Sequence, residues 1–197
     1  MILFVGHDAS LTGAPKSLLL IIEHFSKNYN EPISIILKEG GPLEDEYRKL
    51  GKVFIWEKKW YYEKNIFIRI KNRLLDNKKR NQNKVLKYFN KNKPKVIFNN
   101  TVVNGVILEN ISKLNIPIIS RIPELETVMK IYQVRFNSSN KVLKYSSKFI
   151  TPSLSGQNNL IDNFNIASRN WRNSISFLLY EFLYSFRARI ICLIIFD

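Results

Sequence analysis

The stretch ILFVGHDASLTGAPKSLLLIIEHF, residues 2–25, decides the fold class of this chain. Its first four residues form a continuous apolar run, which is typical of a strand buried on both faces of a parallel sheet. Leu18, Ile21, Ile22 and Phe25 then recur at helical spacing, so a helix with one apolar face is predicted after the loop. The loop lies at the carboxyl end of the strand, where open α/β sheets bind their ligands.

The rest of the chain repeats this order of an apolar run followed by a helical segment. Five further strands are predicted, at residues 33–37, 53–56, 95–98, 117–119 and 148–151. Helices are predicted at residues 42–50, within the basic stretch that ends near residue 90, at 102–114 and at 126–135. Because strands and helices alternate, we predict an α/β fold: a Rossmann-like, doubly wound, mostly parallel sheet with helices on both faces.

Composition limits the kinds of site that the chain can hold. Its 197 residues suffice for one α/β domain with a real core and not comfortably for two. One cysteine, Cys192, and two histidines are too few for an internal disulfide or a zinc cluster, so no metal is expected. Neither G-x-G-x-x-G nor G-x-x-x-x-G-K-[ST] occurs, so both standard nucleotide fingerprints are absent. Met1 leads directly into the first strand without a signal peptide, and we expect a cytoplasmic protein.

A series of short motifs runs along the first 166 residues. They are FVGHD at 4–8, TGAPKSL at 12–18, KEGGPL at 38–43, VIFNNT at 96–101, IPIISRIPELE at 116–126, FITPS at 149–153 and NLI at 159–161. In this order they resemble the N-terminal, acceptor-side half of retaining glycosyltransferases of the GT-B fold, in the large family that includes sucrose and glycogen synthases. The collinear order is more specific than any single motif.

The resemblance implies an enzyme that moves a sugar from a nucleotide-sugar to a glycan or lipid-linked acceptor, with retention of configuration and without a metal or other cofactor. It also implies a role in polysaccharide biosynthesis for the cell envelope. In the family a second domain of similar size holds the donor, and nothing after Ile166 resembles it. We therefore expect an acceptor-side domain at residues 1–166, an aberrant or amphipathic tail at 167–197, and a truncated chain that is inactive unless a second chain completes it.

Three strand ends are expected to meet at one edge of the sheet, and they carry the candidate site residues. The first strand delivers His7 and Asp8, which either bind substrate as donor and acceptor or stabilise the turn. The fourth delivers Asn100 and Thr101, which either bind sugar hydroxyls or cap the helix that starts at Val102. The start of the first helix suits an anion such as phosphate. The substrate-binding residues expected there are Gly13, Ala14 and Lys16.

The segment after the fifth strand is the most diagnostic for activity. Related enzymes often read His-Glu-Leu-Glu here, with the histidine facing the acceptor or the anomeric carbon, whereas this chain has Pro-Glu-Leu-Glu at residues 123–126. Proline cannot donate a hydrogen bond or take up a proton, so the catalytic role passes to Arg121 or Glu124 or is vacant. Arg121 suits a phosphate or carboxylate on the acceptor. Glu124 either serves at the family's acidic position or caps the next helix.

The charge is strongly positive, with 31 Lys and Arg against 16 Asp and Glu, and residues 58–95 hold most of a long basic stretch. Phe67, Ile70 and Leu74 there would form the apolar side of a helix that lies on an anionic membrane surface. Nucleic acid is the competing acidic partner, and a plain exposed helix is the third interpretation. We expect the membrane rather than nucleic acid, because acceptors of the resembling enzymes are often lipid-linked. This predicts a peripheral position at the inner face of the cell membrane.

Residues 167–197 have three interpretations: an out-of-frame tail on a truncated gene, an amphipathic helix on a membrane, or a helix over the exposed inter-domain face, in this order of preference. Glu181, Arg187 and Arg189 interrupt their apolar run, which therefore falls short of a spanning helix. A different class of function also stays open: a non-catalytic Rossmann-like module that binds an anionic membrane surface or a partner protein.

Overall fold

The computed structural model describes residues 1–57, 77–164 and 166. The strands are β1 (Ile2–Gly6), β2 (Ile33–Leu37), β3 (Lys52–Ile55), β4 (Val96–Asn100), β5 (Ile118–Arg121) and β6 (Lys148–Ile150). The helices are α1 (Gly13–Asn28), α2 (Glu44–Leu50), α4 (Asn77–Lys91), α5 (Gly105–Ile111), α6 (Glu126–Phe136), α7 (Ser138–Tyr145) and α8 (Leu154–Phe164). Two 3-10 turns, η2 (Val102–Asn104) and η3 (Ser112–Leu114), flank α5. The predictions for residues 58–76 and 167–197 lie outside the described residues.

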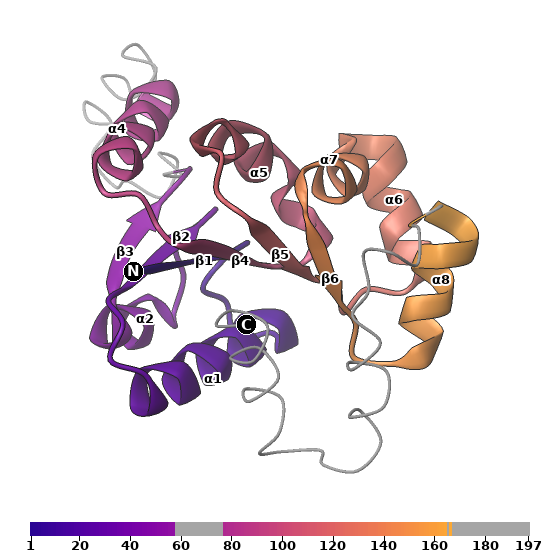
Figure 1. The fold of residues 1–197 in the computed structure, drawn as a ribbon, viewed down its shortest axis with the longest axis horizontal. Coiled ribbons are helices and arrows are strands. Elements are labelled where there is room, and N and C mark those ends of the chain that lie inside the picture. The colour runs from indigo at the N-terminus through magenta and orange to yellow at the C-terminus, as the bar shows by residue number, and fades with distance from the viewer. Residues whose placement is uncertain (58–76, 165, 167–197) are drawn as a thin grey trace.

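The six strands form one sheet in the order β3-β2-β1-β4-β5-β6 (Figure 1). Each of the five neighbouring pairs is parallel. The chain moves outward in one direction from β1 to β3 and in the other direction from β4 to β6. The predicted Rossmann-like, doubly wound sheet is therefore confirmed, with its topological switch point between β1 and β4.

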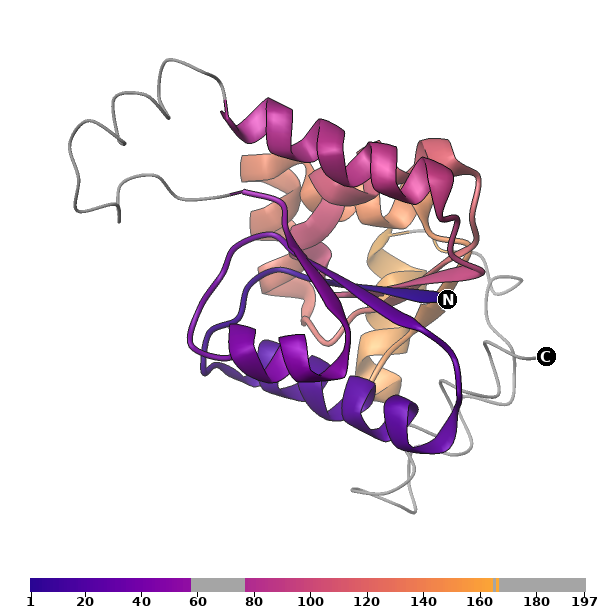
Figure 2. The same cartoon turned by 90° about the vertical axis from the view of Figure 1, so that its left-hand side faces the viewer.

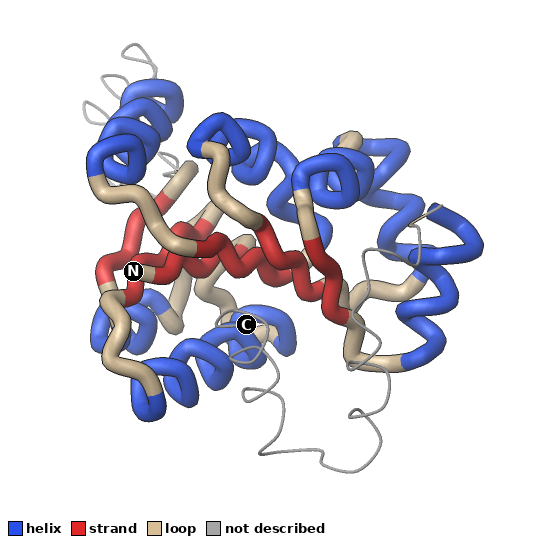
Figure 3. Tube along the Cα trace, in the orientation of Figure 1, coloured by secondary structure: helices blue, strands red, loops and turns tan. Residues whose placement is uncertain are grey.

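Alternate residues of β1 face opposite layers of the molecule, as the two-residue period of a strand requires. Ile2 and Phe4 belong to a core that includes residues of α1 and α2, whereas Leu3 and Val5 belong to a core that includes residues of α4, α5 and α7. Figures 1 and 2 show these helices on the two sides of the sheet, and Figure 3 shows the same three layers by element type. A strand covered on both faces needs the continuous apolar run that the sequence carries.

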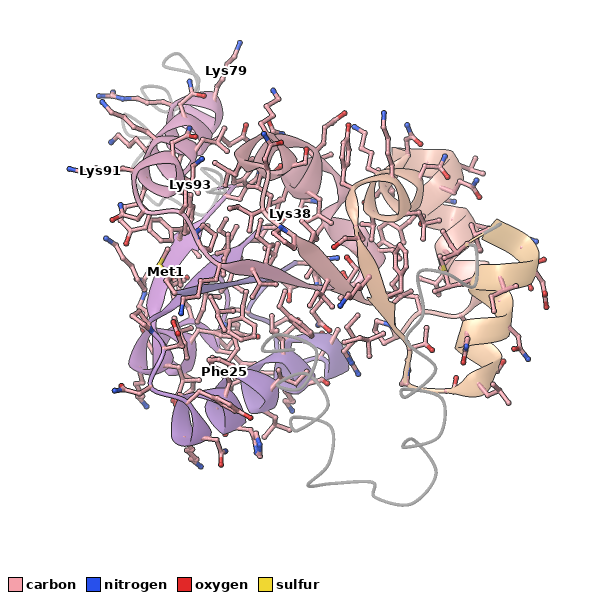
Figure 4. The ribbon with its side chains drawn as sticks, in the orientation of Figure 1. Met1, Phe25, Lys38, Lys79, Lys91 and Lys93 are labelled. Carbon is pink, nitrogen blue, oxygen red and sulfur yellow. The ribbon has the colours of Figure 1, made fainter. Side chains whose placement is uncertain are left out.

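An aromatic cluster joins β1, α1 and β4. The ring centroid of Phe4 lies 5.8 Å from that of Phe25 and 5.6 Å from that of Phe98. Phe25 lies between α1 and the sheet (Figure 4) and also stacks on Tyr29 at 4.9 Å. The opening strand and helix are thus tied to the other half of the sheet by direct ring contacts.

The described part of the basic stretch forms an ordinary surface helix. Val85 and Phe89 on α4 are buried against the sheet. Lys79 and Lys91 are exposed and point away from the sheet in Figure 4. Within the ranges that the structure describes, no helix is long and apolar enough to cross a bilayer.

The helices after β4 and β5 are divided more finely than the sequence predicted. The predicted helix at residues 102–114 consists of η2, α5 and η3. Two helices, α6 and α7, follow β5, because Asn137 between them has a φ of 50° and interrupts the helical backbone. Ser138 and Ser139 then donate hydrogen bonds to backbone carbonyls of η2 and α6. These contacts are distant in sequence, so no local pattern indicated the break.

The aromatic cluster predicts the effect of a core truncation. Phe4→Ala should lower the free energy of unfolding by about 3–5 kcal/mol, because it removes a fully buried ring from a packed core. Leu20→Ala, at a position of α1 that is 64% exposed, should change it by less than about 0.5 kcal/mol. Urea denaturation followed by circular dichroism measures both values. Equal losses in the two variants would contradict the assigned packing.

Candidate functional site

The carboxyl ends of β1, β4 and β5 lie next to one another in the sheet, as the register of the pairs shows. We call the loops that follow these strands the switch-point rim, and define it as residues 6–16, 99–104 and 121–126. The rim contains every candidate site residue that the sequence analysis named. Parallel strands deliver all their carboxyl ends to one edge, which is why the prediction of a common edge is confirmed.

Asn100 connects the three parts of the rim. Its Nδ2 donates to the carbonyl of Ala14 at 3.1 Å, and its Oδ1 accepts from Nη1 of Arg121 at 2.8 Å. The residue is 1% exposed. Both ends of the amide therefore have protein partners, and Asn100 holds the start of α1 and the guanidinium of Arg121 in fixed positions. Its predicted contact with substrate stays a prediction.

A network of buried amides and hydroxyls joins rim residues to the neighbouring strand β5. Asn99 donates to the carbonyl of Thr101 and to the hydroxyl of Ser120, each at 3.0 Å. Asn104 donates to Oδ1 of Asn99 at 2.9 Å. The sequence analysis missed the role of Asn104 because this residue falls inside a predicted helix, where an asparagine carries no special signal. A connected buried network of this kind makes a local geometry rigid.

Thr101 has an unusual backbone conformation, with φ 94° and ψ 155°. This region favours glycine, and a β-branched residue held there costs on the order of 1–3 kcal/mol. Its hydroxyl accepts a hydrogen bond from the backbone N–H of Val103 at 3.2 Å, so the capping role is present. Its predicted hydrogen bond to a sugar stays a prediction. Strain of this kind concentrates at functional sites, and Thr101 lies at the centre of the rim.

Glu124 is the most unusual ionisable group of the rim. Its Oε1 accepts from the backbone N–H of Val102 at 3.3 Å, while Oε2 is buried and has no hydrogen-bond partner in the described part of the chain. Burial raises the pKa of Glu124 to about 7, against the opposing effects of two backbone hydrogen bonds and the charge of Arg121. A carboxyl group with this pKa can both release and accept a proton near neutral pH. Arg121 is also buried, at the end of β5.

His7 and Asp8 contact each other at the end of β1. His7 Nε2 lies 3.2 Å from Asp8 Oδ2, and Asp8 Oδ1 accepts from the backbone N–H of Ser10 at 3.0 Å. Burial lowers the pKa of His7 more than the charge of Asp8 raises it, so the imidazole is neutral at neutral pH. The turn-stabilising role considered for Asp8 is thus present, and both residues keep partly exposed side chains.

The first turn of α1 belongs to the rim, and the loop after β2 packs against it. Gly13 and Lys16 are exposed, and Ala14 is partly buried under the amide of Asn100. Gly41 packs on the β1–α1 loop so closely that a Cβ at this position would lie 2.6 Å from the carbonyl oxygen of Ala9. Only glycine allows this approach. The KEGGPL motif therefore supports the rim from outside, a role that the sequence analysis did not assign.

Among residues 1–57, 77–164 and 166, no three His, Cys, Asp or Glu side chains come together in a way that could hold a metal ion.

Comparisons with known proteins reveal the fold but no family. No family model matches the sequence, and no curated protein matches it. Solved structures do match. HepE of Anabaena, solved in complex with UDP, has a TM-score of 0.56 and 16% identity over 89% of this chain and 42% of that chain.

Two further structures give the same result. A glycosyltransferase from Rickettsia africae has a TM-score of 0.52 and 15% identity over 86% of this chain and 41% of that chain. The UDP-GlcNAc 2-epimerase of Methanocaldococcus jannaschii has a TM-score of 0.54 and 16% identity over 86% of this chain and 44% of that chain. The chain thus spans less than half the length of these proteins, and what it shares with them is the Rossmann-like α/β fold of GT-B structures.

The raised pKa of Glu124 predicts how stability depends on pH. Between the ordinary carboxyl pKa and about 7 the folded protein binds more protons than the unfolded chain, so the free energy of unfolding should fall as pH rises through this window. Glu124→Gln removes the titration. This variant should be more stable than the wild type at about pH 8, by roughly 1–3 kcal/mol, and its stability should vary less with pH.

Urea denaturation at several pH values across this window tests the prediction. Glu126→Gln, at a partly exposed carboxylate two residues further along, is the matched control and should keep the slope of the wild type. If the wild type and Glu124→Gln show the same slope, then the carboxyl of Glu124 does not titrate in this range.

Proposed function

We propose that residues 1–166 form the acceptor-side half of a retaining glycosyltransferase, which transfers a sugar from a nucleotide-sugar to a glycan or lipid-linked acceptor in polysaccharide biosynthesis for the cell envelope. The observation that carries the proposal is the carboxyl of Glu124, with one buried oxygen that lacks a partner among the described residues, beside the strained Thr101 at the switch point. Ligands of open α/β sheets bind at this point.

In this proposal, the acceptor hydroxyl attacks the anomeric carbon of the donor sugar from the same face that the nucleoside diphosphate leaves, so the configuration is retained. The bond between the anomeric carbon and the diphosphate oxygen breaks, the nucleoside diphosphate departs, and Glu124 takes the proton that the hydroxyl loses. A general base works best when its pKa is close to the working pH, and a pKa of about 7 meets this condition. A buried carboxylate oxygen without a hydrogen bond is also energetically costly, and a hydroxyl that reaches it removes this cost. Arg121, held by Asn100, supplies a positive charge for a phosphate or carboxylate of the acceptor.

The donor is a nucleotide-sugar that a second half of the enzyme binds. HepE was solved with UDP, and another matching protein is named for UDP-GlcNAc, which supports this donor class. The chain spans only 41–44% of the proteins compared above, which leaves room for such a half in them. We propose that turnover requires residues 1–166 together with a donor-binding domain. We also propose that the enzyme works in the cytoplasm, peripherally at the inner face of the membrane.

Calorimetry tests which half of the enzyme binds the nucleotide-sugar. The purified chain should not bind UDP- or GDP-sugars by itself, because its share of the site faces the acceptor. When a donor-binding domain is supplied with it, the chain should bind one of them and release the nucleotide. Tight binding of a nucleotide-sugar by the chain alone would overturn the assignment of the donor site to the other half. Conversion of UDP-GlcNAc to its 2-epimer without transfer would replace the transferase by an epimerase.

The role of Glu124 is tested in the completed enzyme. Glu124→Gln should lower the rate of transfer by about 100-fold or more, because general base catalysis contributes about 100- to 10,000-fold. Glu126→Gln should retain most of the activity. Transfer by Glu124→Gln at the wild-type rate would show that the carboxyl is structural.

A further inference from the structure

Helix α6 carries apolar side chains on its buried side and also on its exposed side. On its inner side Met129 is fully buried and Tyr132 packs against the core of α5 and α7. On its outer side Val128, Ile131 and Val134 are 39%, 43% and 84% exposed. Large apolar side chains that gather on the exposed side of a helix mark a surface that a partner covers. The described part of the molecule covers only the inner side.

The outer apolar residues form a continuous stripe. Leu125, Val128, Ile131 and Val134 follow one another at every third position, so neighbouring members lie side by side on the helix. Nine large apolar side chains are exposed in the described residues, and five of them lie between residues 125 and 136. An exposed apolar patch of this density marks an interaction surface. The shallow groove along it has a volume of about 480 Å³ and is lined by Glu126, Thr127, Lys130, Ile131, Val134 and Arg135.

The charges beside the stripe indicate what covers it. Lys130 lies on one side of Ile131 and Val134 on the helical wheel, and Arg135 lies on the other. Lys130 pairs with Glu126, the one acidic residue between residues 126 and 148. The basic residues of this segment, which forms α6, α7 and the start of β6, are Lys130, Arg135, Lys141, Lys144 and Lys148.

Lys130 pairs with Glu126 and Lys141 with Glu109 of α5, so five cations face two carboxylates and the segment keeps a positive charge. This excess of positive charge favours one occupant over another. A second copy of the chain would bring two surfaces of the same positive charge together, which opposes its binding. An anionic lipid surface attracts them instead. Apolar side chains that enter the interface, bordered by Lys and Arg whose heads reach the lipid phosphates, are the pattern of a helix that lies in the plane of a membrane.

We propose that the outer face of α6 docks on an anionic lipid bilayer, with Ile131 and Val134 in the boundary between headgroups and acyl chains. Lys130 and Arg135 contact the lipid phosphates on either side. Because Glu124 is only two residues before α6, docking brings the switch-point rim close to the membrane surface. If the proposed function holds, the acceptor is then carried by a lipid rather than being a free glycan.

Sedimentation with lipid vesicles tests the docking without any assay of activity. The full chain should bind vesicles of equimolar phosphatidylcholine and phosphatidylglycerol and should bind pure phosphatidylcholine much more weakly. The double variant Ile131→Ser, Val134→Ser should bind the anionic vesicles at least about tenfold more weakly, because it removes buried apolar area. Lys130→Gln with Arg135→Gln should weaken binding by about tenfold or more and reduce its dependence on salt.

Control variants identify the surface responsible. Val106→Ser, at an exposed valine of α5, should bind vesicles like the wild type. Thermal unfolding should show that all variants are folded. If Phe67→Ser with Ile70→Ser abolishes binding while the α6 variants bind normally, the membrane surface lies in the basic stretch and the proposal is wrong. A concentration-dependent dimer that Val134→Ser disrupts would likewise overturn it in favour of a second copy. If the wild-type chain binds anionic vesicles as expected but the completed enzyme transfers no sugar, the proposed function is wrong and the docking proposal stands.

Discussion

Asn100 donates to the carbonyl of Ala14 and accepts from Arg121, and these two hydrogen bonds hold three loops together that are far apart in the sequence. The loops leave β1 and β4 in opposite directions at the switch point, so the backbone ladder cannot connect them beyond the strand ends. The buried amide of Asn100 connects them instead, because it has both a donor group and an acceptor group. An apolar side chain in its place would leave a carbonyl and a guanidinium without these partners in a buried position, which is the costly outcome for polar groups.

This rigid connection explains how the rim tolerates two energetically unfavourable features. Thr101 keeps a positive φ, and its carbonyl is held by Asn99 from below. Glu124 keeps a carboxyl in a site that disfavours its charge, and Val102 satisfies one of its oxygens. Neither feature contributes to stability, and both lie where the fold class binds ligands. The simplest physical account is that the network maintains a prepared site, and this is the basis of the glycosyltransferase proposed above.

Several parts of this arrangement were predictable because they depend on local patterns. Residues 2–5 are apolar without interruption, and the strand they form is buried on both faces. His7, Asn100 and Arg121 come just after predicted strands, so their convergence followed from parallel pairing. The break at Asn137, the network through Asn104 and the support from Gly41 were missed, because each depends on a partner that the local sequence does not contain.

The sequence by itself determined the six strands, their alternation with helices and the edge that carries the site, because the period of apolar residues encodes how each element is buried. Tertiary structure decided what each polar side chain does. Asn100 is used internally, one oxygen of Glu124 lacks a partner in the described residues, and the outer apolar stripe of α6 lies exposed. The physical reason is that periodicity describes one element at a time. Hydrogen-bond satisfaction and surface exposure instead depend on which distant residues the fold brings near, or fails to bring near.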